Sequence, residues 1–388
     1  MDRIADCRHA AGRARGARLY PPGGRSGRGR GGWPMIGVLA AGMVTAVGLD
    51  WVASAAAMRA RLDGFAETRF IAPGGWRIGA PVPLPRNWIG QRRMAHLAAG
   101  AVADILRQEP AATEAALILC LAEEGRPGRP VQDPSALLRM LSQILGLPER
   151  RAHVVAHGRP SGFVGLERAR RMIAAGQAGR VILLGLDSYL TGPALAHYAG
   201  LERLLQNGNA DGFIPGEAAA AVLLGPGGAL RLTGLGLARE AAFLGNARGE
   251  DGADLPLRGD GMAAAYRAAL AEAETDLAHV EYRISDLPGE QHFFRQAALM
   301  TLRLERGRTA FQDLWSPAES LGNIGAAAVP AMLGMALAAV RKGYAPGSPV
   351  LVEASGDDGA CGAAVLHEAR GPARRVSAED RLATGAVR

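Results

Sequence analysis

Cysteine and charge are both scarce in this sequence. The 388 residues include three cysteines, Cys7, Cys120 and Cys361, and none of them falls in a C-x-x-C pair. This excludes a disulfide framework and a cysteine zinc site, and it favours a reducing, cytoplasmic setting. Only 21% of the residues are charged whereas 48% are hydrophobic. The chain can therefore bury a large core, which excludes a disordered protein, a coiled coil and a disulfide-rich miniprotein.

The net charge of +7 is concentrated in residues 1–34. These contain eight arginines against Asp2 and Asp6, a balance of +6 that leaves +1 for the rest of the chain. Because the body is nearly neutral, we expect no nucleic-acid partner unless the arginine- and glycine-rich segment provides it. That segment lacks apolar periodicity and is predicted to be a disordered tail, unless translation begins at Met35. Residues 369–388 are predicted to be a second disordered tail.

An apolar stretch from Met35 to Gly48 imitates a secretion signal, because a basic run precedes it and Ala53-Ser54-Ala55 follows it like a cleavage site. A buried first strand, Ile36–Ala40, that enters a glycine turn at Gly42 explains the same residues, and we favour it. The uncharged stretch Gly322–Val340 is rich in alanine and is predicted to be a buried helix, so we expect no membrane span.

Short apolar runs alternate with amphipathic stretches, a pattern typical of helices that cover a largely parallel sheet. Strands are predicted at Leu117–Leu121, Ala152–Ala156, Val181–Leu186, Ala219–Leu224, Leu230–Leu235, Tyr282–Ser285 and Val350–Ala354. Helices are predicted at Ile89–Arg107, Pro134–Leu145, Ser161–Ala175, Gly261–Ala273, Glu290–Leu304 and Ile324–Lys342. The turn Gly225-Pro226-Gly227-Gly228 separates an N-terminal half, 35–228, from a C-terminal half, 229–368, and the similar order of elements in both predicts a duplication.

Several familiar site motifs are absent from the sequence. It contains no G-x-x-x-x-G-K-[ST], no G-x-G-x-x-G that opens a helix after a strand, and no H-E-x-x-H, so we expect neither a cofactor nor a metal site. The segment from His157 to Gly162 passes from a β run into a helix and has the outline of a hydrolase nucleophile elbow. We interpret Ser161 there as a helix cap rather than a nucleophile.

Five segments taken together carry a family resemblance. They are Gly42–Gly48, Arg159–Gly162, Val181–Ser188, Asp211–Leu224 and Ser320–Ala328. As a set they resemble the β-ketoacyl synthases of the thiolase fold, over roughly Met35 to Leu366. The resemblance implies an α/β protein of five layers, α-β-α-β-α, with two pseudo-duplicated halves. It also implies a homodimer and a possible acyl carrier protein partner.

The resemblance further indicates where catalytic groups would stand. Arg159 occupies the place of the family's nucleophilic cysteine, and Asp286 and Asn323 occupy the places of its two histidines. An arginine is always protonated and cannot act as a nucleophile, and an ionised aspartate repels an enolate. We therefore expect no functional catalytic residue, and we favour a protein without enzymatic activity.

The family's glycine-rich loop falls on Ser355–Cys361, whose polar side chains include Asp357, Asp358 and Cys361. A thiolate is the nucleophilic form of cysteine, and a helix N-terminus stabilises it. Cys361 lies off the helix terminus. A relocated nucleophile at Cys361 is the catalytic alternative.

A cation at a helix N-terminus is unfavourable by about 0.3–1 kcal/mol, so Arg159 needs a nearby anion. We predict an ion pair with Asp286, or with Glu290 as the second choice, and a hydrogen bond added by Asn323. In the alternative, Arg159 reaches solvent and Asp286 caps a turn. The predicted pair would fill the former catalytic pocket and occupy the acyl channel.

Another set of segments resembles the thiolase-like accessory proteins of type VI secretion effector modules. They include Ala66–Phe70, Ile78–Leu84, Asp286–Gln291, Asp313–Glu319 and Arg341–Gly347. This resemblance implies an inactive adaptor that binds a secretion effector or chaperone. The alternative is a 3-oxoacyl-ACP synthase relative of the acyltransferase type, or an inactive partner of an active synthase, like a chain-length factor.

Overall fold

The computed structural model of the chain describes residues 35–72, 75–149, 152–244, 255–308 and 311–369. The predicted tails, 1–34 and nearly all of 369–388, lie outside the described residues, as does Cys7.

Ten strands form a mixed sheet in the order β10-β9-β11-β12-β8-β1-β7-β6-β4-β5. The strands are β1 (Ile36–Val44), β4 (Ala116–Leu121), β5 (Ala152–Ala156), β6 (Val181–Ser188), β7 (Glu217–Pro226), β8 (Leu230–Arg239), β9 (Tyr282–Ser285), β10 (Asp313–Trp315), β11 (Val350–Ser355) and β12 (Ala360–Glu368). A separate hairpin joins β2 (Ala66–Ala72) and β3 (Gly75–Gly79).

The helices alternate with these strands. They are α1 (Trp51–Arg59), α2 (Gly90–Gln108), α3 (Pro134–Leu145), α4 (Ser161–Ala174), α5 (Gly192–Gly200), α6 (Asp260–Glu272), α7 (Gln291–Leu304), α8 (Ala318–Leu321) and α9 (Ala328–Lys342). Short 3₁₀ turns lie at Pro110–Glu114, Leu277–His279 and Gly325–Ala327.

The strand order repeats within the sheet. One side reads β5-β4-β6-β7-β1 and the other reads β10-β9-β11-β12-β8, and numbering each set in chain order gives 3-2-4-5-1 for both. The directions repeat too: the first two pairs of each set are parallel, and the pairs that β7 and β12 make are antiparallel. The two sets meet where β1 pairs with β8. This is the duplicated α/β architecture that the sequence predicts.

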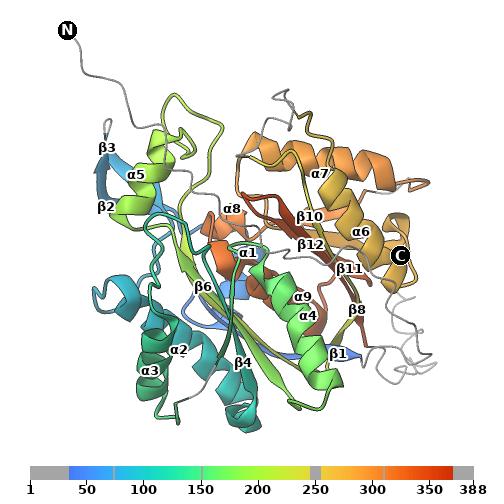
Figure 1. The fold of residues 1–388 in the computed structure, drawn as a ribbon, viewed down its shortest axis with the longest axis horizontal. Coiled ribbons are helices and arrows are strands. Elements are labelled where there is room, and N and C mark those ends of the chain that lie inside the picture. The colour runs from blue at the N-terminus through green and yellow to red at the C-terminus, as the bar shows by residue number, and fades with distance from the viewer. Residues whose placement is uncertain (1–34, 73–74, 150–151, 245–254, 309–310, 370–388) are drawn as a thin grey trace, which may run out of the picture. The chain divides into compact units, whose positions relative to one another are not determined.

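The helices form three layers around the two sets of strands, which gives the five-layered order. α2 packs on β1, β6 and β7 with α3 beside it, and α6 packs on β8 and β12 with α7 beside it. α4 and α9 lie between the sets and contact strands of both. In Figure 1, α2 and α3 lie on one side, α6 and α7 on the other, and α4 and α9 between them.

The first strand is longer than the sequence predicts. β1 continues through Gly42 to Val44, so the predicted glycine turn is wrong. A Cβ on Gly42 would lie 1.9 Å from the backbone oxygen of Ala101 in α2. The glycine therefore allows α2 to approach the strand rather than making a turn. The imitation cleavage site, Ala53-Ser54-Ala55, lies within α1.

Among the helices and strands of the described residues, the sequence prediction missed seven: β2, β3, β10, β12, α1, α5 and α8. The helical stretch Gly325–Lys342 is long and apolar enough to cross a membrane, but 83% of it is buried inside the protein. That burial is typical of the core helix that the sequence predicts.

Candidate functional site

The loop between β5 and α4 places Arg159 at the start of the central helix. Gly158 has a φ of +63°, and Pro160 is the N-cap residue of α4. The hydroxyl of Ser161 accepts a hydrogen bond from the His157 amide at 2.9 Å and donates one to the Leu121 carbonyl at 3.3 Å. Ser161 is the first residue of the helix and bonds outside it, so the predicted cap is wrong. Its side chain ties the loop to β4.

The Arg159 side chain is 3% exposed and points into the protein. Its Nε lies 3.7 Å from Oδ2 of Asp286, which follows β9, and its Nη2 lies 3.2 Å from Oδ1 of Asp357. The guanidinium also lies over the Phe293 ring, 4.0 Å from its centroid. The predicted ion pair with Asp286 is present, and the nearer anion is Asp357.

A second arginine, Arg203, completes the cluster, and sequence reasoning missed it. Its Nε donates to Glu290 Oε1 at 2.6 Å and its Nη2 donates to Glu290 Oε2 at 2.9 Å. Its Nη1 donates to Asp357 Oδ2 at 2.7 Å. Glu290, the second choice for Arg159, thus pairs with Arg203 instead. The sequence carries no motif at Arg203, and the burial of Glu290 that calls for a cation is visible in the structure alone.

Asn323 precedes α9 as Arg159 precedes α4, but its side chain does not make the predicted contact with the ion pair of Arg159 and Asp286. Its Oδ1 accepts a hydrogen bond from the Gly325 amide at 3.1 Å, and its backbone bonds Ile214 and Gly216. The predicted hydrogen bond from Asn323 to the ion pair is therefore wrong. The residue closes the turn that leads into α9.

The two other polar residues of the loop are turned away from Arg159. Asp358 Oδ1 accepts from the Ala360 amide at 3.0 Å and shapes the turn between β11 and β12. Cys361 packs in the outer core with α6, and its Sγ accepts from Gln296 Nε2 at 3.4 Å. The next residue, Gly362, faces Phe163 of α4. Because side chains alternate along a strand, Cys361 points to the opposite face.

Burial and neighbouring charges shift the pKa values of the two carboxyl groups of the cluster in opposite directions. Burial raises the pKa of Asp286 to about 7, although the Arg159 charge opposes that rise. Burial also acts to raise the pKa of Asp357, but Arg159 and Arg203 outweigh it, so its pKa lies below the usual value. Asp357 is therefore the permanent anion between the two arginines. Burial raises the pKa of the Cys361 thiol to about 12, which leaves it protonated at neutral pH.

The arrangement offers structural ion pairing and no evident nucleophile. A relocated nucleophile at Cys361 would need a base beside it, such as His292 of α7, but among the described residues no hydrogen bond or ring contact joins the two or places either against Arg159. Burial and the Arg159 charge lower the pKa of His292. No group of three or more His, Cys, Asp or Glu side chains in the described part of the chain could hold a metal ion.

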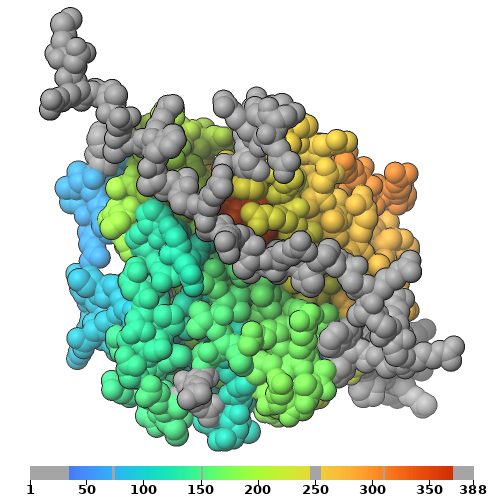
Figure 2. Space-filling view, viewed as in Figure 1, coloured from blue at the N-terminus to red at the C-terminus, as the bar shows by residue number. Residues whose placement is uncertain are grey.

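One cavity borders this cluster, and a second lies beside the β2–β3 hairpin. The first, of about 540 Å³, is lined by Glu123, Arg126, Tyr198, Arg203 and Asp357 among others. Figure 2 shows a hollow on this face, with atoms of the C-terminal segment at its bottom. The cavity reaches Asp357, whose side chain is 30% exposed, and Arg159 is not among the residues that line it. Asp357 thus separates Arg159 from the cavity.

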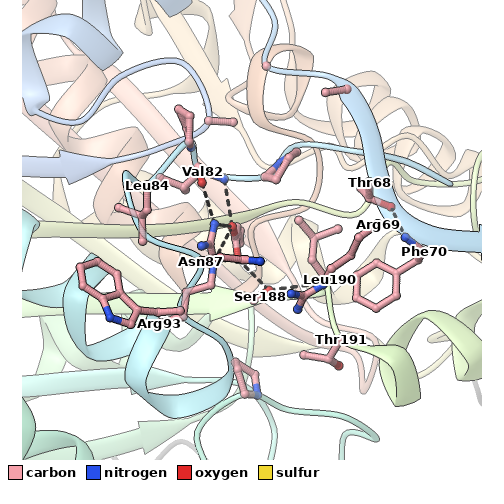
Figure 3. A pocket seen from close by; sticks show the side chains of 18 of the residues that line it. Thr68, Arg69, Phe70, Val82, Leu84, Asn87, Arg93, Ser188, Leu190 and Thr191 are labelled. Atoms are coloured by element: carbon pink, nitrogen blue, oxygen red, sulfur yellow. Dashed lines mark hydrogen bonds and ion pairs between the residues drawn. The ribbon is translucent and has the colours of Figure 1, made fainter. Parts of the chain in front are cut away.

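The other cavity, of about 910 Å³, lies beside the β2–β3 hairpin. In its wall, Arg93 Nε lies 3.0 Å from Glu217 Oε2, and Ser188 Oγ donates to the same carboxylate at 3.1 Å. Figure 3 shows Arg93, Val82 and Ser188 converging there, with Phe70 and Leu190 nearby. Because these polar groups satisfy one another, we interpret the Arg93–Glu217 pair as a structural element of the cavity wall.

Comparisons with known proteins identify the architecture. No family model and no curated protein matches the chain. Among solved structures, it is similar to the ketosynthase ApeO in complex with its chain length factor ApeC from Xenorhabdus doucetiae, with a TM-score of 0.70 and 17% identity over 87% of this chain and 98% of that one. The fold is that of the ketosynthases.

Two further ketosynthase structures give the same result. A β-ketoacyl synthase from Burkholderia phymatum STM815 has a TM-score of 0.65 and 17% identity over 87% of this chain and all of that one. AntDE:AntF, a type II polyketide acyl-carrier protein in complex with its ketosynthase, has a TM-score of 0.68 and 14% identity over 87% of this chain and 100% of that one. At these identities the similarity concerns the ketosynthase fold alone.

Proposed function

We propose that this chain is a catalytically silent protein of the ketosynthase fold that acts by pairing with another protein. The observation that carries the proposal is Arg159, buried before α4 and held by Asp286 and Asp357. By the resemblance, this is the place of the family's cysteine. A guanidinium there cannot attack a thioester, and its two carboxylate partners occupy the space beside it.

The other groups near the cluster support the same proposal. Stabilising an enolate requires hydrogen-bond donors aimed at the developing charge. Neither position supplies the imidazole that the family uses: Asp286 lies 3.7 Å from the Arg159 guanidinium, and Asn323 is held by its Oδ1 on the Gly325 amide. The two cysteines of the described residues, Cys120 and Cys361, are both buried, and burial raises the pKa of each thiol.

An exposed strand edge supports pairing. β5 lies at one end of the sheet, with β4 on one side and no strand on the other among the described residues. Its Val154 side chain is 43% exposed. An open edge with an exposed apolar residue is a template for another strand. We propose that β5 of this chain pairs with β5 of a second copy or with the matching strand of an active synthase, as a chain-length factor would.

An acyl-transfer assay tests the part of this proposal that says the chain is catalytically inactive. The purified protein is incubated with an acyl thioester and its intact mass is measured, beside an active ketosynthase as the positive control. We expect no acyl adduct on this chain. We also expect Arg159→Cys to yield no condensation product, because the two histidines that the family uses are missing as well. A stable adduct on the wild-type protein would overturn the proposal.

The type VI secretion adaptor is the more specific form of the same binding role, and the sequence segments named above support it. Affinity purification of the full chain from its native host separates the alternatives. A secretion effector or chaperone as the stoichiometric partner favours the adaptor. A ketosynthase or acyl carrier protein as that partner favours the chain-length-factor role.

A further inference from the structure

A groove lies between α1 and the C-terminal end of α9, and its lining residues differ from those of the cluster around Arg159. Two cavities, of about 530 and 260 Å³, lie there and share Ala55, Arg59 and Tyr344 as lining residues. The Arg59 guanidinium lies 4.1 Å from the centroid of the Tyr344 ring, so this stack divides the groove into two lobes. None of the residues that line the lobes belongs to the Arg159 cluster.

Apolar and aromatic side chains form the walls of the groove. Trp51 lines the larger lobe, and its indole N–H already donates to the Gly334 carbonyl at 2.9 Å, so its remaining surface is apolar. Val52 beside it is 56% exposed. Trp315 and Met335 line the smaller lobe. An open apolar surface of this kind on a folded protein marks an interaction or ligand site.

The groove also carries an unbalanced positive charge. Arg59, Arg61 and Lys342 line it, and Glu319 is the acidic side chain in its lining. Within the described part of the chain, none of these three cations has a carboxylate at ion-pair distance. The C-termini of α1 and α9 lie here, and each contributes about half a negative charge. Three lining cations against one lining carboxylate and two helix ends leave an excess of positive charge, and Arg341, whose guanidinium lies 5.5 Å from the centroid of the Trp51 ring, adds to it.

We propose that this groove binds one small amphipathic anion, with an aliphatic or aromatic tail in the larger lobe and a carboxylate or similar monoanion at Arg59. A lobe of about 530 Å³ lies in the range of small-molecule sites, which are mostly apolar with a few polar groups that fix orientation. The excess of positive charge favours an anionic headgroup over a neutral one. The cation of Arg59, held over Tyr344 and free of a carboxylate, is the group that pairs with it.

Displacement of a fluorescent probe tests the proposal. The probe is 8-anilinonaphthalene-1-sulfonate, an aromatic monoanion, titrated into the full-length protein and followed by energy transfer from tryptophan. We expect one saturable site per chain. Decanoate should displace the probe at a concentration about tenfold lower than decan-1-ol does, because only the carboxylate forms a charge-assisted bond.

Two variants and a control make the test specific. Arg59→Met keeps an apolar stem but removes the charge, so decanoate should lose about tenfold in affinity while decan-1-ol is unchanged. Ala56→Trp fills the larger lobe and should abolish both. Arg139→Met, on α3 and 51% exposed, should behave as wild type. Unsaturable binding, equal displacement by acid and alcohol, or wild-type affinity for decanoate in either groove variant would overturn the proposal.

Discussion

Replacing Arg159 by methionine should show how much the ion pairs of the cluster contribute to the free energy of unfolding. The change removes the cation that lies 3.7 Å from Asp286 and 3.2 Å from Asp357 while keeping an apolar side chain over Phe293. Asp357 keeps Arg203, but Asp286 loses its cation and is 5% exposed. Removing one partner of a buried ion pair costs about 3–5 kcal/mol. Asp286 can avoid part of this cost by taking up a proton, at about 1.36 kcal/mol for each pH unit above its pKa of about 7. We therefore expect a loss of about 2 kcal/mol through this carboxyl in the free energy of unfolding at pH 8.5.

The loss should depend on pH in a defined direction. In the wild type the pKa of Asp286 is raised from 3.8 to about 7. A carboxyl whose folded-state pKa is raised contributes stability that is complete at low pH and is lost as the pH rises through the folded-state value. Without Arg159 the pKa rises further, so Asp286 is neutral at pH 6 and needs no cation. The destabilisation should therefore be smaller at pH 6 than at pH 8.5.

Urea denaturation followed by circular dichroism at both pH values measures this difference. Adding Asp286→Asn to Arg159→Met should restore most of the loss at pH 8.5, because the buried orphan charge is gone. Arg139→Met, an exposed arginine 3.8 Å from Asp133, should change stability by less than about 0.5 kcal/mol. Equal losses at the two pH values, or no recovery in the double variant, would refute the reasoning.

Three further predictions concern the edge strand, the core and the thiol. Under the proposed pairing of β5 with β5 of a second copy, Val154→Lys should shift the protein from a dimer towards a monomer in light scattering, because a charge on an open edge blocks strand pairing; an unchanged mass would argue against β5 as the interface between copies. Gly42→Ala should lower the stability by about 1–3 kcal/mol or more in thermal unfolding, because the new Cβ meets the Ala101 carbonyl. Cys361, buried and with its pKa raised to about 12, should resist iodoacetamide at pH 8 until the protein is denatured, and fast labelling of the native protein would contradict the assigned environment.

Long elements with a strong local pattern could be predicted from the sequence. The continuous apolar run that forms β6 and the amphipathic spacing of α2 and α3 lead to bounds that agree with the structure within two residues at each end. The hairpin β2–β3 could not, because its sequence mixes Glu, Thr and Arg with apolar residues without a clear alternation. The strand β12 was missed for another reason. Alanine and glycine have little intrinsic preference for a strand, and β8 and β11 on either side hold the segment.

The candidate site was predictable where a residue stood in a recognisable segment. Arg159 could be placed because the helix that follows it has a characteristic start, and its need for an anion pointed to Asp286. Arg203 could not, because it follows α5 in a loop without a motif. Asp357 was named as part of the loop, but its role between two arginines depends on the approach of segments more than 150 residues apart. Only tertiary structure brings these charges together.

The position of β1 bears on how the chain reaches its native state. This apolar strand is among the first described residues, yet it lies at the centre of the sheet, where Ile36 pairs with Pro226 and Val38 with Leu230. At synthesis rates of about 5–20 residues per second, the nascent strand waits roughly 10 to 40 s for those partners. During that interval its hydrogen-bonding groups and side chains are open to other chains. Expression at lower temperature or with extra chaperone should therefore raise the soluble yield of this protein.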